Sequence, residues 1–269
     1  MNNQKQKDLG IFYTPKIIVD FIFQMLLVMK NKEDKETKRW QSRKPQHYPS
    51  VIDPACGEGI FLKTAVTSGF TGYHPRQKTP YIFGTDLDGQ VVKSWEKISI
   101  LHDLFKNNKK KMLDHFHEQD GLLELPEKVF TYKRGGLREF DTVVGNPPYG
   151  GSKTQTDQQR EQIKRIANIG KTGGTLDYVC GWLIKTAQYM DQTTLIGYVT
   201  TNSITQGEQV GQLWPILLEK YHLTINFAHR QFKWESESRG KAHVIVIVLG
   251  LSKNYKNNLQ NFYFFTTIN

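Results

Sequence analysis

The chain contains few cysteines and no long apolar run, and these shortages exclude several classes of protein. Only two of its 269 residues are cysteines, Cys56 and Cys180. Two thiols cannot build a disulfide scaffold or supply the four ligands of a cysteine-only zinc or iron–sulfur site. The longest apolar run near the start, residues 17–29, is interrupted by Asp20 and Gln24, and the opening residues are too polar for a signal peptide. We therefore expect a cytoplasmic protein with no membrane partner and no metal site.

Acidic side chains are scarce relative to basic ones. The 36 Lys and Arg residues exceed the 26 Asp and Glu residues, which gives a formal net charge of +10 at pH 7. This excess favours a polyanionic partner such as DNA, because neutralised phosphates release condensed counterions. A basic surface without such a partner is the alternative interpretation of the charge alone. The candidate phosphate contacts are Lys106, Lys109, Lys110 and Lys111.

Strand-like and helix-like segments alternate along the chain, and this alternation predicts an α/β fold. Strands are expected at residues 50–53, 81–86, 113–119, 140–145, 194–200, 223–229 and 242–250, and helices at 17–29, 59–68, 90–105, 178–190 and 208–220. Repeated strand–helix–strand units predict a single domain over residues 1–269, with a mostly parallel seven-stranded sheet covered by helices on both faces. Residues 30–48 are expected to form a charged loop. Residues 150–175 are expected to form a mobile polar loop near the active site that could contain a short helix.

An acidic, glycine-bearing loop follows the first predicted strand. It reads D-P-A-C-G-E-G and contains Asp53, Pro54, Ala55, Cys56, Gly57, Glu58 and Gly59. Glycines let the backbone turn sharply and approach a ligand closely. A dinucleotide loop would read G-x-G-x-x-G and present amides to a pyrophosphate, whereas Asp53 would repel phosphate. S-adenosylmethionine, which carries ammonium and sulfonium groups and no phosphate, suits this loop better. An ordinary strand–helix turn is the alternative.

Carboxylates also follow the second and third predicted strands. Asp86 could bind both hydroxyls of a ribose, while Asp88 competes for that role but is better placed to cap the next helix. Asp120 could accept a hydrogen bond from the amino group of the cofactor adenine. The Asp-Gly pair that begins at Asp120 is also a common surface turn. Since ligands bind at the carboxyl ends of parallel strands, these loops are expected to share one edge of the sheet.

The loop after the fourth predicted strand carries the pattern N-P-P-Y, which consists of Asn146, Pro147, Pro148 and Tyr149. An adenine amino nitrogen is a poor nucleophile because its lone pair is delocalised into the ring. Acceptors on its two N–H bonds, the Asn146 side-chain oxygen and the Pro147 carbonyl, would favour the positive charge that develops during attack. Consecutive prolines fix the backbone, and Tyr149 offers a flat face for the base. A rigid turn with a packed tyrosine is the alternative.

With these motifs the sequence resembles the amino-methylating DNA methyltransferases of the gamma arrangement. In that family a cofactor motif precedes D-P-A-C-G-x-G, and N-P-P-Y comes later; L-G-I-F-Y-T-P at residues 9–15 resembles the leading motif. The resemblance implies a Rossmann-like class I fold and methylation of N6 of adenine in double-stranded DNA. It implies cofactor contacts for Phe12, Thr14, Pro15, Asp53, Pro54, Ala55, Cys56, Gly57, Gly59, Asp86 and Asp120.

The stretch from residue 200 to 234 resembles the methyltransferase part of bifunctional type II restriction–modification enzymes. In the family a late aromatic side chain covers the second face of the flipped base. Phe232 is the candidate, Phe227 and Trp234 are possible substitutes, and all three could instead be core aromatics. The resemblance implies a restriction–modification or phage-defence system. A target-recognition domain is not evident in the sequence, so we expect a separate recognition subunit or a further C-terminal domain to supply specificity.

Two other functions are compatible with parts of the sequence. Methyltransferases that modify a glutamine side-chain amide in proteins also use N-P-P-Y, although the leading motif, the polar stretch after Tyr149 and the basic charge argue against that substrate. A truncated, non-catalytic DNA-binding subunit is the second alternative. The intact Asn146, Pro147 and Tyr149 argue against loss of catalysis.

Overall fold

The structure is a computed structural model, and it describes residues 14–37, 49–73, 80–95, 103–105, 115–123, 140–168, 175–234, 244–253 and 263–265. Phe12 and the four lysines predicted to contact phosphate lie outside these residues. Within the described ranges, none of the helices combines the length and the apolar character needed to cross a membrane.

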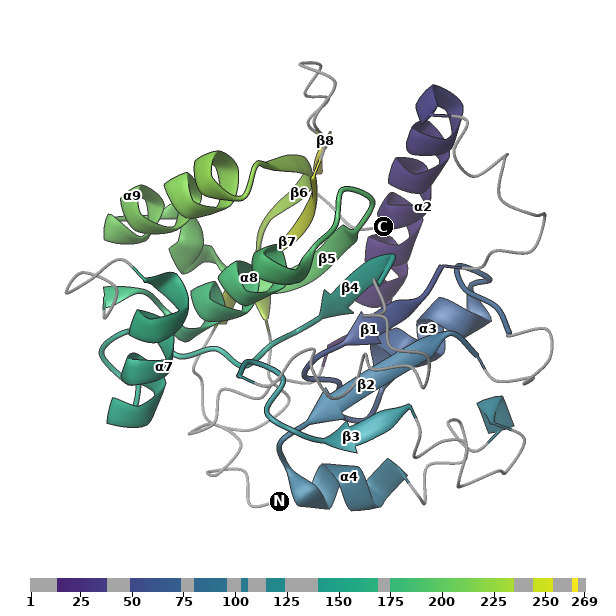
Figure 1. Ribbon diagram of the computed structural model, residues 1–269, viewed down its shortest axis with the longest axis horizontal. Helices are drawn as coiled ribbons and strands as arrows, with labels where there is room; N and C mark the ends of the chain where they lie inside the picture. Colours follow the sequence, from purple (N-terminus) through teal and green to yellow (C-terminus); the bar gives the residue numbers. More distant parts are fainter. Residues whose placement is uncertain are drawn as a thin grey trace.

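A central sheet organises the chain (Figure 1). Its strands are β1 (Val51–Asp53), β2 (Ile82–Asp86), β3 (Phe116–Glu118), β4 (Thr142–Gly145), β5 (Leu195–Thr201), β6 (Leu223–Trp234), β7 (Val244–Lys253) and β8 (Tyr263–Phe265). They lie in the order β3-β2-β1-β4-β5-β7-β6-β8. Strands β1 to β5 pair in parallel, and β7 is antiparallel to both of its neighbours. The predicted mostly parallel α/β sheet is confirmed, and all seven predicted strands form.

Strand β8 is an addition that the sequence analysis did not predict. It pairs in parallel with β6 at the edge of the sheet, from Phe227↔Tyr263 to His229↔Phe265. A strand of three residues is too short to show a period-2 pattern, so only its pairing with β6 identifies it.

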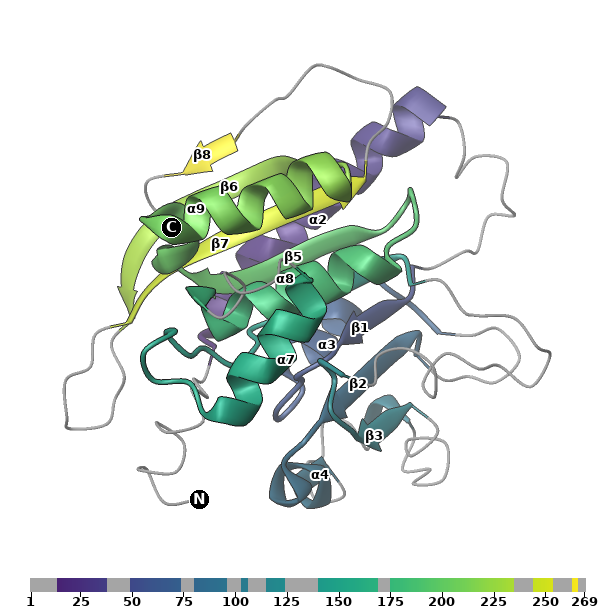
Figure 2. The same cartoon turned by 60° about the vertical axis from the view of Figure 1, so that its left-hand side comes forward.

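Helices cover both faces of the sheet (Figures 1 and 2). They are α2 (Lys16–Thr37), α3 (Ile60–Thr67), α4 (Gly89–Trp95), α7 (Asp157–Ala167), α8 (Tyr178–Tyr189) and α9 (Glu208–Trp214). A 3-10 turn, η2 (Asn202–Thr205), precedes α9, which continues into a π-helical turn, η3 (Pro215–Lys220). Two neighbouring residues of β5, Gly197 and Tyr198, face the helix layers on opposite sides of the sheet. A Cβ on Gly197 would meet Ile22 and Leu26 of α2, whereas the hydroxyl of Tyr198 lies 2.9 Å from that of Thr186 on α8.

The predicted charged loop at residues 30–48 is wrong in its first part, because α2 extends to Thr37. Residues 30–37 read K-N-K-E-D-K-E-T, and Lys and Glu are good helix formers. Lys30 and Asp34 are four residues apart in the sequence, as are Lys32 and Glu36, a spacing that is compatible with a helix. Residues 38–48 lie outside the described part of the chain.

The predicted polar segment at residues 150–175 contains the helix that the sequence analysis allowed, because the eleven-residue α7 occupies its centre. A capping box begins this helix. The Thr156 hydroxyl accepts from the Gln159 N–H at 3.2 Å, and the Gln159 side chain accepts from the Thr156 N–H at 3.0 Å. Such a box satisfies two of the amide groups that a helix start leaves unpaired. Residues 169–174 lie outside the described part.

Candidate active site

The loops after β1 and β3 pack directly against each other. A Cβ on Gly121, after β3, would collide with the carbonyl oxygen of Pro54 in the D-P-A-C-G-E-G loop. The Thr85 hydroxyl at the end of β2 donates to the same carbonyl at 2.7 Å. The first three strand ends therefore form one continuous edge, as the parallel sheet predicts.

The glycine loop is held in a conformation that requires glycine. Gly57 has φ +51°, and Gly59, which immediately precedes α3, has φ +83°. Oδ2 of Asp86 accepts from the Gly57 N–H at 2.9 Å, and the indole N–H of Trp95 donates to the Gly57 carbonyl at 2.7 Å. These bonds tie the loop after β1 to the end of β2 and to α4. Asp53, Gly57, Gly59 and Asp86 are thus brought together as the sequence predicts.

One carboxyl group is buried in this loop region, and a second, that of Asp86, is half-buried. Asp53 is 1% exposed, and its Oδ1 accepts from the Ala55 N–H at 3.1 Å. Desolvation, reinforced by repulsion from Asp86, raises the pKa of Asp53 well above its ordinary value. Desolvation also raises the pKa of Asp86. Among the described residues, no Lys, Arg or His forms an ion pair with either carboxyl. The arrangement is suited to a cationic ligand, which would relieve both the desolvation and the repulsion.

Asp86 and Asp88 have different roles at the end of β2. Oδ1 of Asp88 accepts from the Gln90 N–H at 2.9 Å at the start of α4, so Asp88 caps the next helix. Oδ1 of Asp86 accepts from the Asp88 N–H at 2.9 Å, which leaves Asp86 facing the glycine loop. Leu87, between them, is 69% exposed, and the sequence analysis overlooked it.

Asp120 forms the turn that its Asp-Gly pair predicts. Its Oδ1 accepts from the N–H groups of Leu122 at 2.9 Å and Leu123 at 3.1 Å. Its Oδ2 accepts from Nε2 of Gln162, on α7, at 3.3 Å. The turn role is therefore observed, and a cofactor contact remains a prediction.

The N-P-P-Y loop follows β4 directly. Asn146 and Pro148 are half-buried, Pro147 is buried and Tyr149 is 7% exposed. The Tyr149 hydroxyl donates to Oδ1 of Asn146, and burial raises the pKa of this tyrosine, so it stays a neutral donor. An amide oxygen has two lone pairs, so Oδ1 can accept from a second donor. The packed-tyrosine interpretation is thus observed, and stacking of Tyr149 on a base remains a prediction.

The N-P-P-Y loop and the D-P-A-C-G-E-G loop are adjacent because of a glycine. A Cβ on Gly145, the last residue of β4, would lie 2.7 Å from Oδ1 of Asp53. The absent side chain lets the buried carboxylate lie against the residue that precedes Asn146. The first and fourth strand loops therefore form one site, in which a ligand held by Asp53 would be next to a ligand held by Asn146.

Comparison with known proteins identifies the family to which this site belongs. Residues 94–264, more than half of the chain, match the family model described as MmeI, DNA-methyltransferase domain. The chain belongs to this family. Its resemblance to DNA methyltransferases, predicted from D-P-A-C-G-x-G and N-P-P-Y, is thereby confirmed.

The relatives of this MmeI-family chain are much longer proteins. DNA methyltransferase A of Bacillus subtilis strain 168 is 42% identical over 109 residues, which are 40% of this chain and 12% of that protein. The type IIL restriction–modification enzyme MmeI, solved in complex with DNA, superposes on 100% of this chain and 40% of its own, with a TM-score of 0.68 and 24% identity. A candidate class I S-adenosylmethionine-dependent methyltransferase from Listeria monocytogenes superposes on 95% of this chain and 66% of its own, with a TM-score of 0.61 and 16% identity. These superpositions confirm the class I methyltransferase fold.

The remaining predicted site residues of the MmeI-family chain have mixed outcomes. Thr14 is 4% exposed at the start of α2, and the carbonyl of the exposed Pro15 accepts from the Ile18 N–H at 3.1 Å. Phe227 is fully buried and makes an edge contact with Phe21, with ring centroids 6.1 Å apart, so it is a core aromatic. Phe232 of β6 pairs with Val246 of β7, but its side chain lies outside the described part of the structure.

The sequence analysis missed three polar residues near the N-P-P-Y loop. Gln155 donates through Nε2 to the carbonyls of Gly150 at 3.0 Å and Leu176 at 2.8 Å. Oδ1 of Asp177 accepts from the Ser152 N–H at 2.9 Å. The Asp177 N–H in turn donates to Oε1 of Gln209 on α9 at 2.9 Å. These contacts attach the segment after Tyr149 to the start of α8, and no sequence motif predicts them.

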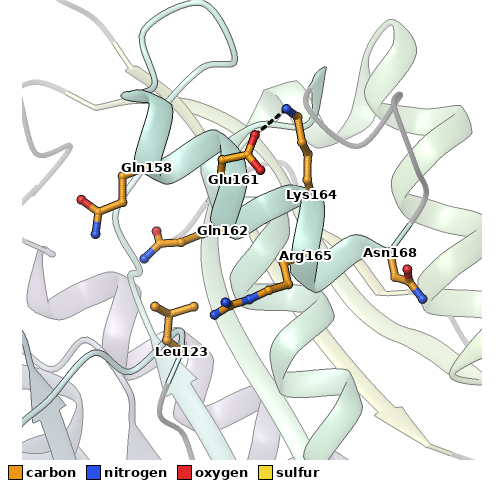
Figure 3. Close-up of a pocket in the computed structure, with 7 residues that line it drawn as sticks. All are labelled: Leu123, Gln158, Glu161, Gln162, Lys164, Arg165 and Asn168. Atoms are coloured by element: carbon orange, nitrogen blue, oxygen red, sulfur yellow. Dashed lines mark hydrogen bonds and ion pairs between the residues drawn. The ribbon is translucent and has the colours of Figure 1, made fainter.

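A groove of about 630 Å³ lies beside this region on α7 (Figure 3). Its lining residues are Leu123, Gln158, Glu161, Gln162, Lys164, Arg165 and Asn168. Lys164 and Glu161 pair at 2.6 Å, which leaves Arg165 as the cation without an ion pair in this lining. None of the predicted cofactor or catalytic residues lines the groove. It is therefore distinct from the site formed by Asp53 and Asn146.

Replacing Gly121 with alanine tests the contact between the loops after β1 and β3. The added methyl group has no room beside the Pro54 carbonyl, so we expect a loss of about 1 to 3 kcal/mol in the free energy of unfolding. Gly211→Ala is the control, since a Cβ at that exposed position of α9 meets nothing within 4 Å. The control should be neutral or slightly stabilising, because alanine favours helix. Urea unfolding measures both, and equal stability of the two variants would contradict the close packing.

Proposed function

We propose that this MmeI-family chain transfers a methyl group from S-adenosylmethionine to the exocyclic N6 amino group of adenine in DNA. The observation that carries the proposal is the adjacency of two preorganised loops. The glycine loop, with the buried carboxyl group of Asp53, lies against the residue that precedes N-P-P-Y, so a cationic methyl donor and a polar acceptor site for an amine would be neighbours. We also propose that the chain works within a restriction–modification or phage-defence system.

The residues after the first three strands fit S-adenosylmethionine. Asp53 would hold the positively charged groups of the cofactor, and Asp86 would hold its ribose. Gly57 and Gly59 would let the cofactor approach the backbone of the loop closely. The exposed Leu87 would cover the adenine ring. The donor supplies a methyl group on a sulfonium, which is activated for transfer without a metal. Asp53 is only 1% exposed, so its carboxyl group would meet the donor with little competition from water.

The N-P-P-Y loop would hold the target amine. Oδ1 of Asn146 and the carbonyl of Pro147 would accept its two N–H bonds and strengthen as the nitrogen gains positive charge. The Tyr149 hydroxyl, which donates to the same Oδ1, holds that oxygen in place. The ring of Tyr149 would stack on the base after the base leaves the duplex.

The names of the relatives support DNA as the substrate. They include a DNA methyltransferase from Bacillus subtilis and an MmeI restriction–modification enzyme in complex with DNA. The chain spans only 12% and 40% of those two proteins. We therefore propose that sequence recognition comes from a separate subunit or from a further domain.

The direct test is transfer of tritiated methyl groups from S-adenosylmethionine, with a metal chelator present, to bulk bacterial DNA that lacks adenine methylation. Label is expected in the DNA, and digestion to nucleosides should recover it as N6-methyl-2′-deoxyadenosine. The same reaction with a bacterial protein lysate should incorporate far less. Label in N4-methylcytosine would make cytosine the substrate, and label mainly in protein glutamine would favour the protein methyltransferase alternative.

A further inference from the structure

A chain of hydrogen bonds connects the loop after β3 with the loop after β4 through α7. Gln162 donates through Nε2 to Oδ2 of Asp120 at 3.3 Å and accepts through Oε1 from the Tyr178 hydroxyl at 2.8 Å. Gln162 and Tyr178 are each 8% exposed. An ionised carboxylate only accepts, so the orientation of the Gln162 amide is fixed. Every hydrogen bond of this bridge, Asp120–Gln162–Tyr178, therefore runs in the same direction: Tyr178 donates to Gln162, and Gln162 donates to Asp120.

One end of the bridge belongs to the proposed cofactor side. Oδ1 of Asp120 shapes the turn after β3 by accepting from Leu122 and Leu123. The next residue, Gly121, touches the Pro54 carbonyl of the glycine loop. A displacement of Asp120 that moves Gly121 would therefore press on the loop that contains Asp53.

The other end of the bridge belongs to the catalytic loop. Tyr178 is the first residue of α8, and its N–H donates to the carbonyl of Gly150 at 2.7 Å. A Cβ on Gly150 would lie 3.3 Å from the Cβ of Tyr178, so the two backbones are in close contact. Gly150 directly follows Tyr149. The position of Tyr178 thus fixes where the N-P-P-Y loop ends.

Burial makes this bridge difficult to break one bond at a time. Desolvation, with a smaller contribution from Asp120, raises the pKa of Tyr178, so its hydroxyl remains a neutral donor. A buried donor or acceptor that loses its partner is penalised more than a satisfied one contributes. The loops after β3 and β4 are therefore expected to move together.

We propose that Gln162 and Tyr178 are positioning residues that couple cofactor binding after β3 to capture of the target base after β4. The inference rests on the proposed function, because it assigns the cofactor to the first three strand loops and the base to N-P-P-Y. A hydrogen-bond donor on the cofactor that binds Asp120 would share the carboxylate to which Gln162 donates. The resulting change in the position of Gln162 would be transmitted through Tyr178 to Gly150. Cofactor and DNA then bind cooperatively.

The test compares Tyr178→Phe, which keeps the ring and removes the hydroxyl, with wild type. Calorimetry gives the Kd for S-adenosylhomocysteine with and without a short duplex that carries a mismatched 2-aminopurine. In wild type the DNA should tighten this Kd about five-fold or more, a usual size for coupling between two sites. In Tyr178→Phe the enhancement should disappear, kcat should fall several-fold, and the Kd without DNA should stay within about two-fold of wild type. Tyr189→Phe, 46% exposed at the other end of α8, should behave as wild type.

A second variant breaks the bridge at its centre. Gln162→Leu should lose the same coupling, and the double variant should lose no more than either single variant, because both changes remove one connection. Gln158→Leu, an exposed change on the same helix, is its control. Variants that unfold at lower urea yet keep the wild-type enhancement would show a merely structural bridge and overturn the inference.

The wild-type measurements separate this inference from the proposed function. Wild type that methylates DNA but shows no enhancement of S-adenosylhomocysteine binding by DNA would overturn the coupling and leave the function intact. Wild type that neither binds S-adenosylhomocysteine nor methylates DNA would overturn the proposed function, and the inference with it.

Discussion

Replacing Asn146 with alanine is expected to lower the rate of methyl transfer to DNA about 100- to 1000-fold, the usual cost of losing one preorganised polar contact to the transition state. The affinity for S-adenosylmethionine should stay close to that of wild type. Asn146 follows β4, whereas the predicted cofactor contacts follow β1, β2 and β3. Because its oxygen strengthens its hydrogen bond as the amine gains charge, the loss should appear in kcat. Single-turnover transfer assays and calorimetry measure the two quantities.

Two matched variants separate the acceptor from the shape of the loop. Asn146→Asp keeps an acceptor oxygen at the same position, so it should lose much less activity than Asn146→Ala. Tyr149→Phe keeps the ring and removes only the hydroxyl that donates to Oδ1 of Asn146, and it should retain most of the activity. Full activity in Asn146→Ala would exclude the proposed role, and equal losses in the alanine and aspartate variants would attribute the effect to loop packing.

Replacing Asp53 with asparagine is expected to change stability and cofactor affinity in opposite directions. Asp53 is 1% exposed and lies near Asp86, so the neutral amide should stabilise the free protein by about 0.5 to 2 kcal/mol, the range for a single stabilising substitution. Affinity for S-adenosylmethionine should fall about ten- to a hundred-fold, because a hydrogen bond to a charged group contributes roughly 1.5 to 3 kcal/mol. Urea unfolding and calorimetry give the two values. A variant that is less stable than wild type would contradict the assignment of Asp53 as a carboxylate that destabilises the free protein and binds the cofactor.

The same substitution makes a prediction about pH. The pKa of Asp53 is raised in the folded protein above its ordinary value of 3.8, so the folded state binds this proton more tightly than the unfolded chain does. The contribution of Asp53 to stability is therefore fully present below the ordinary pKa and is lost as the pH rises through the raised, folded pKa. The stability advantage of Asp53→Asn should be absent near pH 3.5 and largest at neutral pH. An advantage that is constant with pH would mean that Asp53 does not titrate as described.

The parts of the site that the sequence predicts are those encoded by contiguous residues. The backbone angles of Gly57 and Gly59, the cap at Asp88 and the position of Asn146 after a β-branched strand all follow from short motifs. The sheet follows because strand periodicity and alternation with helices are also local signals.

The features that the sequence could not predict depend on contacts between distant residues. Gln162 and Asp120 are 42 positions apart, and nothing in either local sequence specifies that they meet. Phe227 is an aromatic in a late strand like Phe232, and its burial against Phe21 becomes evident only when α2 packs on the sheet. The error at residues 30–37 has another cause, since a dense charge run was interpreted as loop although its spacing suits a helix.

The reactivity of the two cysteines can report on opening of two different parts of the protein. Cys56 lies in the glycine loop and Cys180 in α8, both are buried, and desolvation raises the pKa of each thiol. Thiol reagents attack the thiolate, so both residues should be nearly inert while the fold stays closed. Alkylation of Cys56 then reports how often the loop after β1 opens, whereas alkylation of Cys180 reports how often the packing around α8 comes apart. The ratio of the two rates distinguishes local breathing at the cofactor edge from global unfolding, without any engineered probe.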